Sequence, residues 1–199
     1  MKKLVLFLVL FTAVTTSSLK SYSTDPKFFV QELVTEAIGK LSDKSLNDEE
    51  KAKFIEKIAL ENVDINALGL YTLGELRNSK NKEDITKYQK IFERYFLKSL
   101  TSRLKDYSSS KFTVTSVEQK SANYTIVSSK VSPEDGSVEI KIDWRVYTKN
   151  PNKPLIRDLI VEGLSLARTQ KEEFASILNS NNNNLEFLIT KLEEFVNKK

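Results

Sequence analysis

Asp158 and Glu162 are the residues of this sequence whose type and spacing come nearest to catalytic chemistry. They lie four positions apart in a segment that we expect to be a strand, so both carboxylates face the same side. Such a pair can serve as general acid and base. A solvated face, or ion pairing with Arg145 or Arg157, explains them more simply, because no nucleophile or oxyanion hole occurs at a recognisable spacing. The neighbouring Gly163 indicates a bulge or a close backbone approach rather than a binding loop.

The composition excludes most other catalytic chemistry. The 199 residues include no histidine and no cysteine. Catalysis by Ser-His-Asp or Cys-His groups, thiol redox chemistry and the usual zinc sites are therefore excluded. We expect a protein that is not an enzyme and that carries no cofactor and no metal ion.

The first residues have the layout of a secretory signal peptide. Met1-Lys2-Lys3 precedes an apolar run that starts at Leu4, and this run is about 11 residues long, whereas a membrane span needs roughly 20. We predict a cleaved signal peptide over residues 1–23, with cleavage after Ser23 or nearer Ser18. Residues 24–199 then form a single domain, exported to the periplasm.

Removal of the signal peptide also changes the charge of the protein. The full chain has a formal net charge of +4, and the lost segment contains Lys2, Lys3 and Lys20 but no acidic residue. Subtracting three leaves the mature chain at +1. Nucleic-acid-binding domains keep a strong basic surplus, so this class of protein is excluded.

The first half of the remaining chain has helical periodicity. Four helices are expected: one that starts at Asp25-Pro26 and continues to Leu41, one that starts near Asn47–Glu50, a short one over Asp64–Leu76, and a long one from Lys82 or Glu83 to about Tyr107.

Beyond Ser110 the apolar residues alternate with polar ones, as in strands with one buried face. About four strands are expected, over Phe112–Ser116, Tyr124–Val131, Val138–Val146 and Leu155 to about Leu166. Two helices follow, near Thr169–Asn179 and Leu185–Asn197. The sequence therefore predicts an α+β fold, with a curved antiparallel sheet covered by N-terminal and C-terminal helices that enclose an apolar pocket.

Two stretches of the chain resemble the MlaC family of periplasmic phospholipid-binding proteins, also known as toluene-tolerance auxiliary proteins. The stronger is Asp158-Leu-Ile-Val-Glu-Gly-Leu-Ser-Leu166, followed by Phe174. The other comprises Asp64-Ile65, Leu73-Gly74 and the aromatic helix that follows. The sequence departs from the family in two places: Leu70 and Tyr71 stand where an arginine is expected, and Lys171 stands where an arginine is common.

This resemblance implies a carrier that shuttles phospholipid between the outer and inner membranes as the soluble component of an ABC-type lipid transport (Mla) system. It implies two partners, an outer-membrane lipoprotein complex and an inner-membrane ABC transporter with a periplasmic lipid-exchange domain. The only bound molecule would be the phospholipid cargo, and we expect a monomer. The alternative is an envelope protein-binding module with a packed interior. A small hydrolase or isomerase is a third hypothesis, which the apolar inner face of Val138–Val146 argues against.

The candidate lipid-binding residues come from the long helix and the strands, the two layers that should face each other. Ordinary core packing is the simpler explanation for each of them taken singly, because periodicity does not distinguish a filled core from a cavity wall. The lipid-contact hypothesis therefore depends on the family resemblance. The candidates are Phe92, Phe96, Leu100, Ile142, Trp144, Val161 and Leu164.

Overall fold

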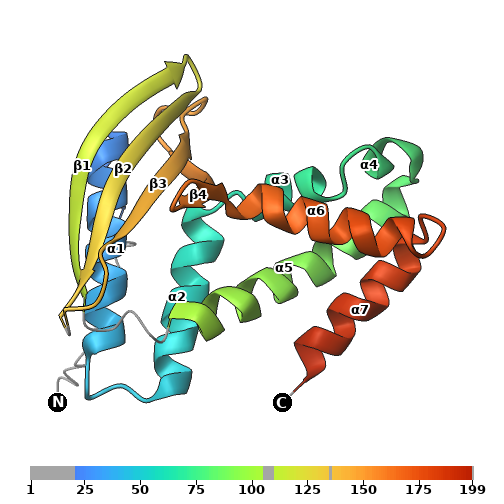
Figure 1. Ribbon diagram of the computed structural model, residues 1–199, viewed down its shortest axis with the longest axis horizontal. Helices are drawn as coiled ribbons and strands as arrows, with labels where there is room; N and C mark the ends of the chain where they lie inside the picture. The colour runs from blue at the N-terminus through green and yellow to red at the C-terminus, as the bar shows by residue number, and fades with distance from the viewer. Residues whose placement is uncertain (1–20, 105–109, 135, 199) are drawn as a thin grey trace, which may run out of the picture.

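The computed structural model describes residues 21–104, 110–134 and 136–198, and Figure 1 shows their arrangement. Five helices come first, followed by the strands and two further helices, which confirms the predicted α+β class. The helices are α1 (Pro26–Ser42), α2 (Asp48–Asn62), α3 (Ile65–Thr72), α4 (Leu76–Ser79), α5 (Lys82–Leu104), α6 (Leu166–Asn179) and α7 (Leu185–Asn197). The strands are β1 (Ser110–Ser121), β2 (Tyr124–Pro133), β3 (Ile140–Tyr147), β4 (Leu155–Val161) and β5 (Leu164–Ser165).

The first two helices begin where the sequence predicts. The Asp25 side chain accepts hydrogen bonds from the backbone N–H groups of Lys27 and Phe28, and Pro26 occupies the first helical position. Asn47 and Glu50 form a reciprocal capping box at the start of α2. In each case a side-chain oxygen satisfies N–H groups that the helix itself leaves unpaired.

The segment predicted as one short helix over Asp64–Leu76 is instead two helices. Asp64 caps α3 through the N–H of Ala67, but Gly74 has a φ of +57°, and this left-handed conformation separates α3 from α4. Helix α5 is described as far as Leu104, so the predicted end near Tyr107 lies outside the described residues.

The strands form one antiparallel meander in the order β1-β2-β3-β4-β5. The predicted last strand, Leu155 to about Leu166, is wrong because the chain reverses within it. Glu162 and Gly163 make a two-residue turn with φ values of 48° and 82°, and this turn pairs Val161 with Leu164. A Cβ on Gly163 would meet nothing within 4 Å, so this glycine serves the turn and marks neither a bulge nor a close approach.

The third strand also begins later than predicted. It starts at Ile140, and Val138 lies before it with 85% of its surface exposed. The turn after β2 therefore extends through the first residues of the predicted strand. From Ile140 onward the alternation holds, and it ends in the fully buried Val146.

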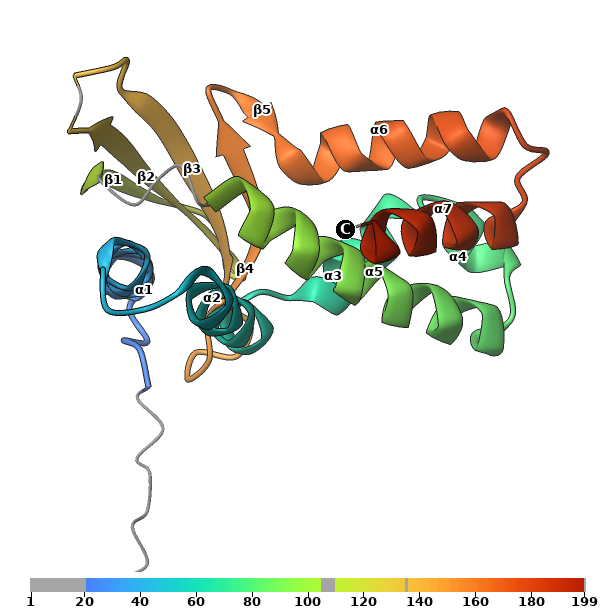
Figure 2. The same cartoon turned by 90° about the horizontal axis from the view of Figure 1, so that it is seen from below.

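The buried side chains form two separate clusters. We call the first the sheet cluster; it joins α1, α2 and the strands, with Val127, Val146 and Ile156 on the sheet side. The second, the helical cluster, joins α3, α5, α6 and α7. Figures 1 and 2 show the sheet with α1 and α2 on one side of the molecule and α6 and α7 on the other, with α5 extending between them.

Candidate functional site

The inner face of the sheet, which packs on α1, provides the base of the candidate site. Side chains that face the same side of the sheet lie next to each other on neighbouring strands. Val127 is the cross-strand neighbour of Trp144, and Trp144 is the cross-strand neighbour of Leu159. Phe29 and Val30 of α1 are almost completely buried in the same cluster. The centre of this face is therefore closed by α1.

Further apolar side chains of the strands and of the end of α5 pack against the sheet cluster, and we call this set the apolar rim. Each member packs against the sheet cluster and remains partly exposed, so none is fully removed from solvent. The members come from the end of α5 and from three strands. They are Leu100, Leu104, Phe112, Val114, Trp144 and Leu159.

Trp144 is the most firmly held residue of the apolar rim. Its indole N–H donates to Ser129 Oγ at 2.8 Å, and Ser129 Oγ donates in turn to the Ile142 carbonyl at 3.0 Å. The Phe112 ring meets the indole edge-on, with 6.1 Å between centroids. Because the polar N–H is satisfied within the sheet, the indole presents only apolar surface to a ligand.

The predicted lipid-binding residues of α5 divide between the two clusters. Phe92 is 3% exposed and belongs to the helical cluster, and Phe96 is partly buried against that cluster. Leu100, one turn further on, packs against the sheet cluster instead. The long apolar stripe of α5 therefore faces two environments, and the structure does not bring Phe92 together with the strands.

The predicted residues of the strands lie at different exposures. Trp144 belongs to the apolar rim, and Ile142 and Val161 are partly exposed cross-strand neighbours. Leu164 is 69% exposed on β5, where the turn at Glu162 and Gly163 places it beside Val161, the last residue of β4. It is not enclosed by the fold.

Four residues of the apolar rim were not among the predicted residues: Leu104, Phe112, Val114 and Leu159. Sequence signals existed for all four. Leu104 follows Leu100 by four positions on the apolar stripe of the long helix. Phe112 and Val114 alternate with polar residues, and Leu159 has the same parity as Val161 on β4. Leu159 is also the cross-strand partner of Trp144.

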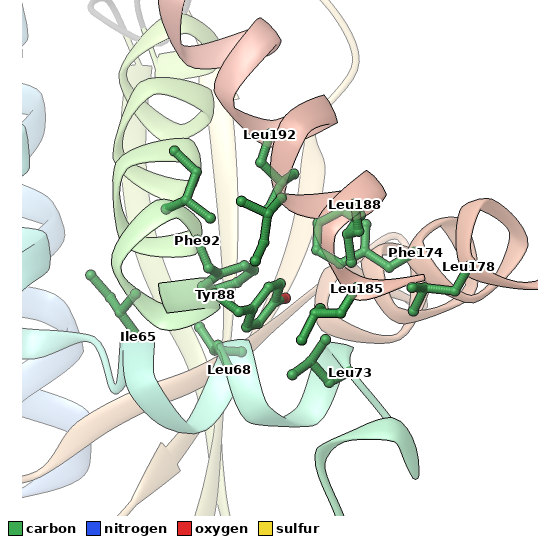
Figure 3. Close-up of a cluster of buried hydrophobic side chains, with 12 residues drawn as sticks. Ile65, Leu68, Leu73, Tyr88, Phe92, Phe174, Leu178, Leu185, Leu188 and Leu192 are labelled. Atoms are coloured by element: carbon green, nitrogen blue, oxygen red, sulfur yellow. The ribbon is translucent and has the colours of Figure 1, made fainter. Parts of the chain in front are cut away.

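The helical cluster is closed by tightly packed aromatic side chains (Figure 3). Tyr88 is completely buried, and its hydroxyl shares a 2.7 Å hydrogen bond with Thr72 Oγ1, which also donates to the Gly69 carbonyl. Burial raises the pKa of Tyr88 far above its ordinary value. Phe92 lies so close to Gly69 that a Cβ there would be 2.9 Å from the ring. The side chains around Phe92 and Tyr88 are therefore closely packed.

The carboxylate pair considered for acid–base chemistry is not a pair in the structure. Asp158 is 4% exposed; it accepts hydrogen bonds from Ser165 Oγ at 2.6 Å and Ala167 N at 3.0 Å, and lies 3.7 Å from the guanidinium of Arg145. Glu162 lies in the exposed turn and accepts from the backbone N–H of Lys141 at 2.5 Å. The predicted ion pair of Asp158 with Arg145 is confirmed.

Arg157 forms a separate network that joins the sheet to α3. Its guanidinium donates to Asp64 Oδ2 at 2.8 Å and to the Tyr124 hydroxyl at 2.9 Å, and it stacks 3.4 Å from the centroid of Tyr147. Burial disfavours the charge, but the hydrogen bonds to Tyr124 and Asp64 outweigh it and raise the pKa of Arg157. Because Asp64 also caps α3, this network connects β4 to the start of α3 and has a structural role.

Within the described residues, no group of three or more acidic, histidine or cysteine side chains is arranged to hold a metal ion. In the same residues, no helix combines the length and apolarity needed to cross a bilayer.

Comparison with known proteins identifies the family. The family model described as "MlaC protein" matches residues 31–194. The chain belongs to the MlaC family. This membership confirms the resemblance found in the sequence, and the match includes both stretches that carry it.

A solved structure has the same fold. It is the phospholipid-binding protein from Ralstonia solanacearum in complex with a phospholipid, with a TM-score of 0.70 and 18% sequence identity over 84% of this chain and 94% of that one. At this identity the likeness concerns the fold. No curated protein sequence matches the chain.

Proposed function

We propose that this MlaC-family protein is a periplasmic phospholipid carrier that moves lipid between the outer and inner membranes. The observation that carries the proposal is the apolar rim, a set of partly exposed apolar side chains that pack against the sheet cluster. The Ralstonia solanacearum protein of the same fold was solved in complex with a phospholipid, which supports a phospholipid as the ligand.

Acyl-chain burial supplies enough free energy to hold a lipid without any chemical step. Each methylene removed from water contributes about 0.8 kcal/mol, so two chains with about 30 methylenes gain on the order of 24 kcal/mol. A bilayer offers a similar gain. Exchange between carrier and membrane is therefore nearly balanced, whereas escape into water is strongly opposed.

The direction of transport must then be set by partners. We propose the two that the family resemblance implies, an outer-membrane lipoprotein complex and an inner-membrane ABC transporter with a periplasmic exchange domain. The carrier itself is proposed to be a monomer without enzymatic activity or cofactor.

The proposed export includes cleavage of the predicted signal peptide, and the contacts of Tyr22 and Ser23 indicate where the cleavage should occur. The Tyr22 ring packs edge-on against Phe29 at 6.3 Å between centroids, and the Ser23 N–H donates to Glu32 at 2.8 Å. Cleavage after Ser23 would remove this tyrosine from the sheet cluster. We therefore favour cleavage nearer Ser18, which the intact mass of the mature protein will test.

The proposed function is tested by native mass spectrometry, with lipid extraction, on protein purified from the periplasm without detergent. We expect one phospholipid per protein, released intact on denaturation. Folded protein that is reproducibly empty would contradict the carrier and favour an envelope protein-binding module.

A further inference from the structure

A cavity of about 240 Å³ lies on the outer face of the sheet, away from the apolar rim. It is lined by Ala67, Leu68, Tyr71, Tyr124, Arg145, Arg157, Asp158 and Ala167. Arg145 and Asp158 are the direct neighbours in sequence of Trp144 and Leu159, which lie on the inner face. Successive side chains of a strand point to opposite faces, so the cavity and the apolar rim are separated by the sheet.

Arg145, one of the two arginines that line this cavity, has N–H groups that are free to donate hydrogen bonds. The Arg145 side chain is 45% exposed, and its ion pair with Asp158 is 3.7 Å long. Among the described residues, no acceptor lies within hydrogen-bond distance of the Arg145 guanidinium. A guanidinium carries five N–H donors in a planar fork that matches a carboxylate.

The carboxylates near Arg145 accept their hydrogen bonds from other groups. Both oxygens of Asp158 accept hydrogen bonds, one from Ala167 N and one from Ser165 Oγ. Asp64 does not line the cavity, and its Oδ2 lies 2.7 Å from Nη2 of Arg157. Two carboxylates thus lie beside the cations of Arg145 and Arg157. The ammonium of Lys171 lies 5.1 Å from the centroid of the Tyr71 ring.

A second polar donor and apolar walls complete the cavity. The Tyr124 hydroxyl accepts its hydrogen bond from Arg157, so its own proton is available to a ligand. Ala67, Leu68 and Ala167 provide apolar walls, and Tyr71 is a 40% exposed aromatic one. Apolar walls with a few convergent polar groups are the usual construction of a small-molecule or side-chain pocket.

We propose that this outer cavity binds a carboxylate carried on a short apolar or aromatic group, with Arg145 and Tyr124 as its hydrogen-bond donors. The carboxylate belongs either to a small free acid or to an acidic side chain of a partner protein. The site is independent of the proposed lipid-binding function.

The test is an NMR titration of the isotopically labelled mature protein with two probes. The first is sodium benzoate. The second is the blocked peptide acetyl-Ala-Glu-Ala-amide, with its glutamine counterpart as control. We expect saturable shifts at residues that line the cavity with at least one acidic probe. Binding of benzoate alone indicates a free acid, and binding of the glutamate peptide but not the glutamine one indicates a protein side chain.

Three variants decide whether the shifts report this site. Arg145→Gln should weaken binding at least tenfold, and Ala167→Leu, which fills the cavity and keeps the cation, should do the same. Arg168→Gln is the matched control, because Arg168 is an exposed arginine that pairs with Glu172, and it should bind like the wild type. Absence of saturable shifts with both acidic probes, or unchanged affinity in a folded Arg145→Gln variant, would overturn the proposal.

Discussion

Helix α5 contributes side chains to both clusters, but the two clusters differ in how completely their apolar side chains are buried. In the helical cluster, aromatic rings from α5 and α6 close on one another, as in the perpendicular contact of Phe92 with Phe174 at 6.3 Å. In the sheet cluster, α1 closes the centre, while Leu100 and Trp144 remain partly exposed. A single apolar stripe on one helix thus serves a closed core at one end and an accessible surface at the other.

This difference separates two tasks that the same residue types can perform. Closed packing stabilises the protein, since interiors are packed as densely as organic crystals. Partly exposed apolar side chains stabilise the fold less and retain surface for a ligand. Changes in the helical cluster should therefore reduce the free energy of unfolding, whereas changes at the apolar rim should reduce lipid content.

The largest expected loss of stability follows from Phe92→Ala. Phe92 is 3% exposed, and removal of a fully buried phenylalanine costs about 3–5 kcal/mol through lost burial and the cavity left behind. Denaturant unfolding measures this loss. Phe187→Ala is the matched control, because Phe187 is 37% exposed and should cost less than about 1 kcal/mol. Equal losses would contradict the closed packing of this cluster.

A smaller loss is expected from Gly69→Ala. The new Cβ would lie 2.9 Å from the Phe92 ring, and such overpacking costs about 1–3 kcal/mol. Gly39→Ala tests the same chemical change in α1, where nothing lies within 4 Å of the new Cβ. That variant should gain about 0.5–1 kcal/mol from helix propensity. The two changes in unfolding free energy should thus have opposite signs, and a stabilising Gly69→Ala would contradict the close contact.

The smallest effect, and the one that depends on pH, is expected from Tyr88→Phe. At neutral pH the loss of the hydrogen bond to Thr72 costs about 1 kcal/mol. Burial raises the pKa of Tyr88 above its ordinary 10.0, so its phenol stays protonated in the folded state while the unfolded chain loses the proton. The stability contributed by this group is therefore present below pH 10 and is lost as the pH rises above it.

Unfolding of the two proteins at about pH 8 and about pH 11 measures this dependence. The advantage of the wild type over Tyr88→Phe should fall by about 1.4 kcal/mol over one pH unit above the ordinary pKa. Because this exceeds the advantage at neutral pH, Tyr88→Phe should be the more stable protein at about pH 11. Both proteins contain the same lysines, so the effect of lysine titration cancels in the difference between their unfolding free energies. An advantage that stays constant up to pH 11 would mean that Tyr88 is not buried as described.

The sequence predicts local structure well where the signal is local. Asp25-Pro26 and the Asn47–Glu50 capping box mark helix starts, and the structure places them there. It fails where a short turn interrupts an apolar run, as at Gly163 and Gly74, because the positive φ of one residue overrides the surrounding periodicity.

The candidate site was harder to predict, for a physical reason. Periodicity identifies the apolar side of α5 but not which partner that side meets, so Phe92 and Leu100 were assigned to one pocket although they belong to different clusters. The cross-strand register that places Leu159 beside Trp144 is likewise a tertiary property. Trp144 and Leu100 both pack against the sheet cluster, and their contact with lipid stays a prediction.

The central claim, that the accessible end of the apolar surface holds lipid, is tested most directly by Leu100→Glu beside Leu60→Glu. Leu100 belongs to the apolar rim, whereas Leu60 is 49% exposed on α2 and lies outside both clusters. Glutamate is a good helix former, so both variants should retain the wild-type circular dichroism spectrum. Phospholipid per protein, measured after detergent-free purification, should fall at least tenfold in Leu100→Glu and stay unchanged in Leu60→Glu. A folded Leu100→Glu protein with the full lipid content of the wild type would contradict the account.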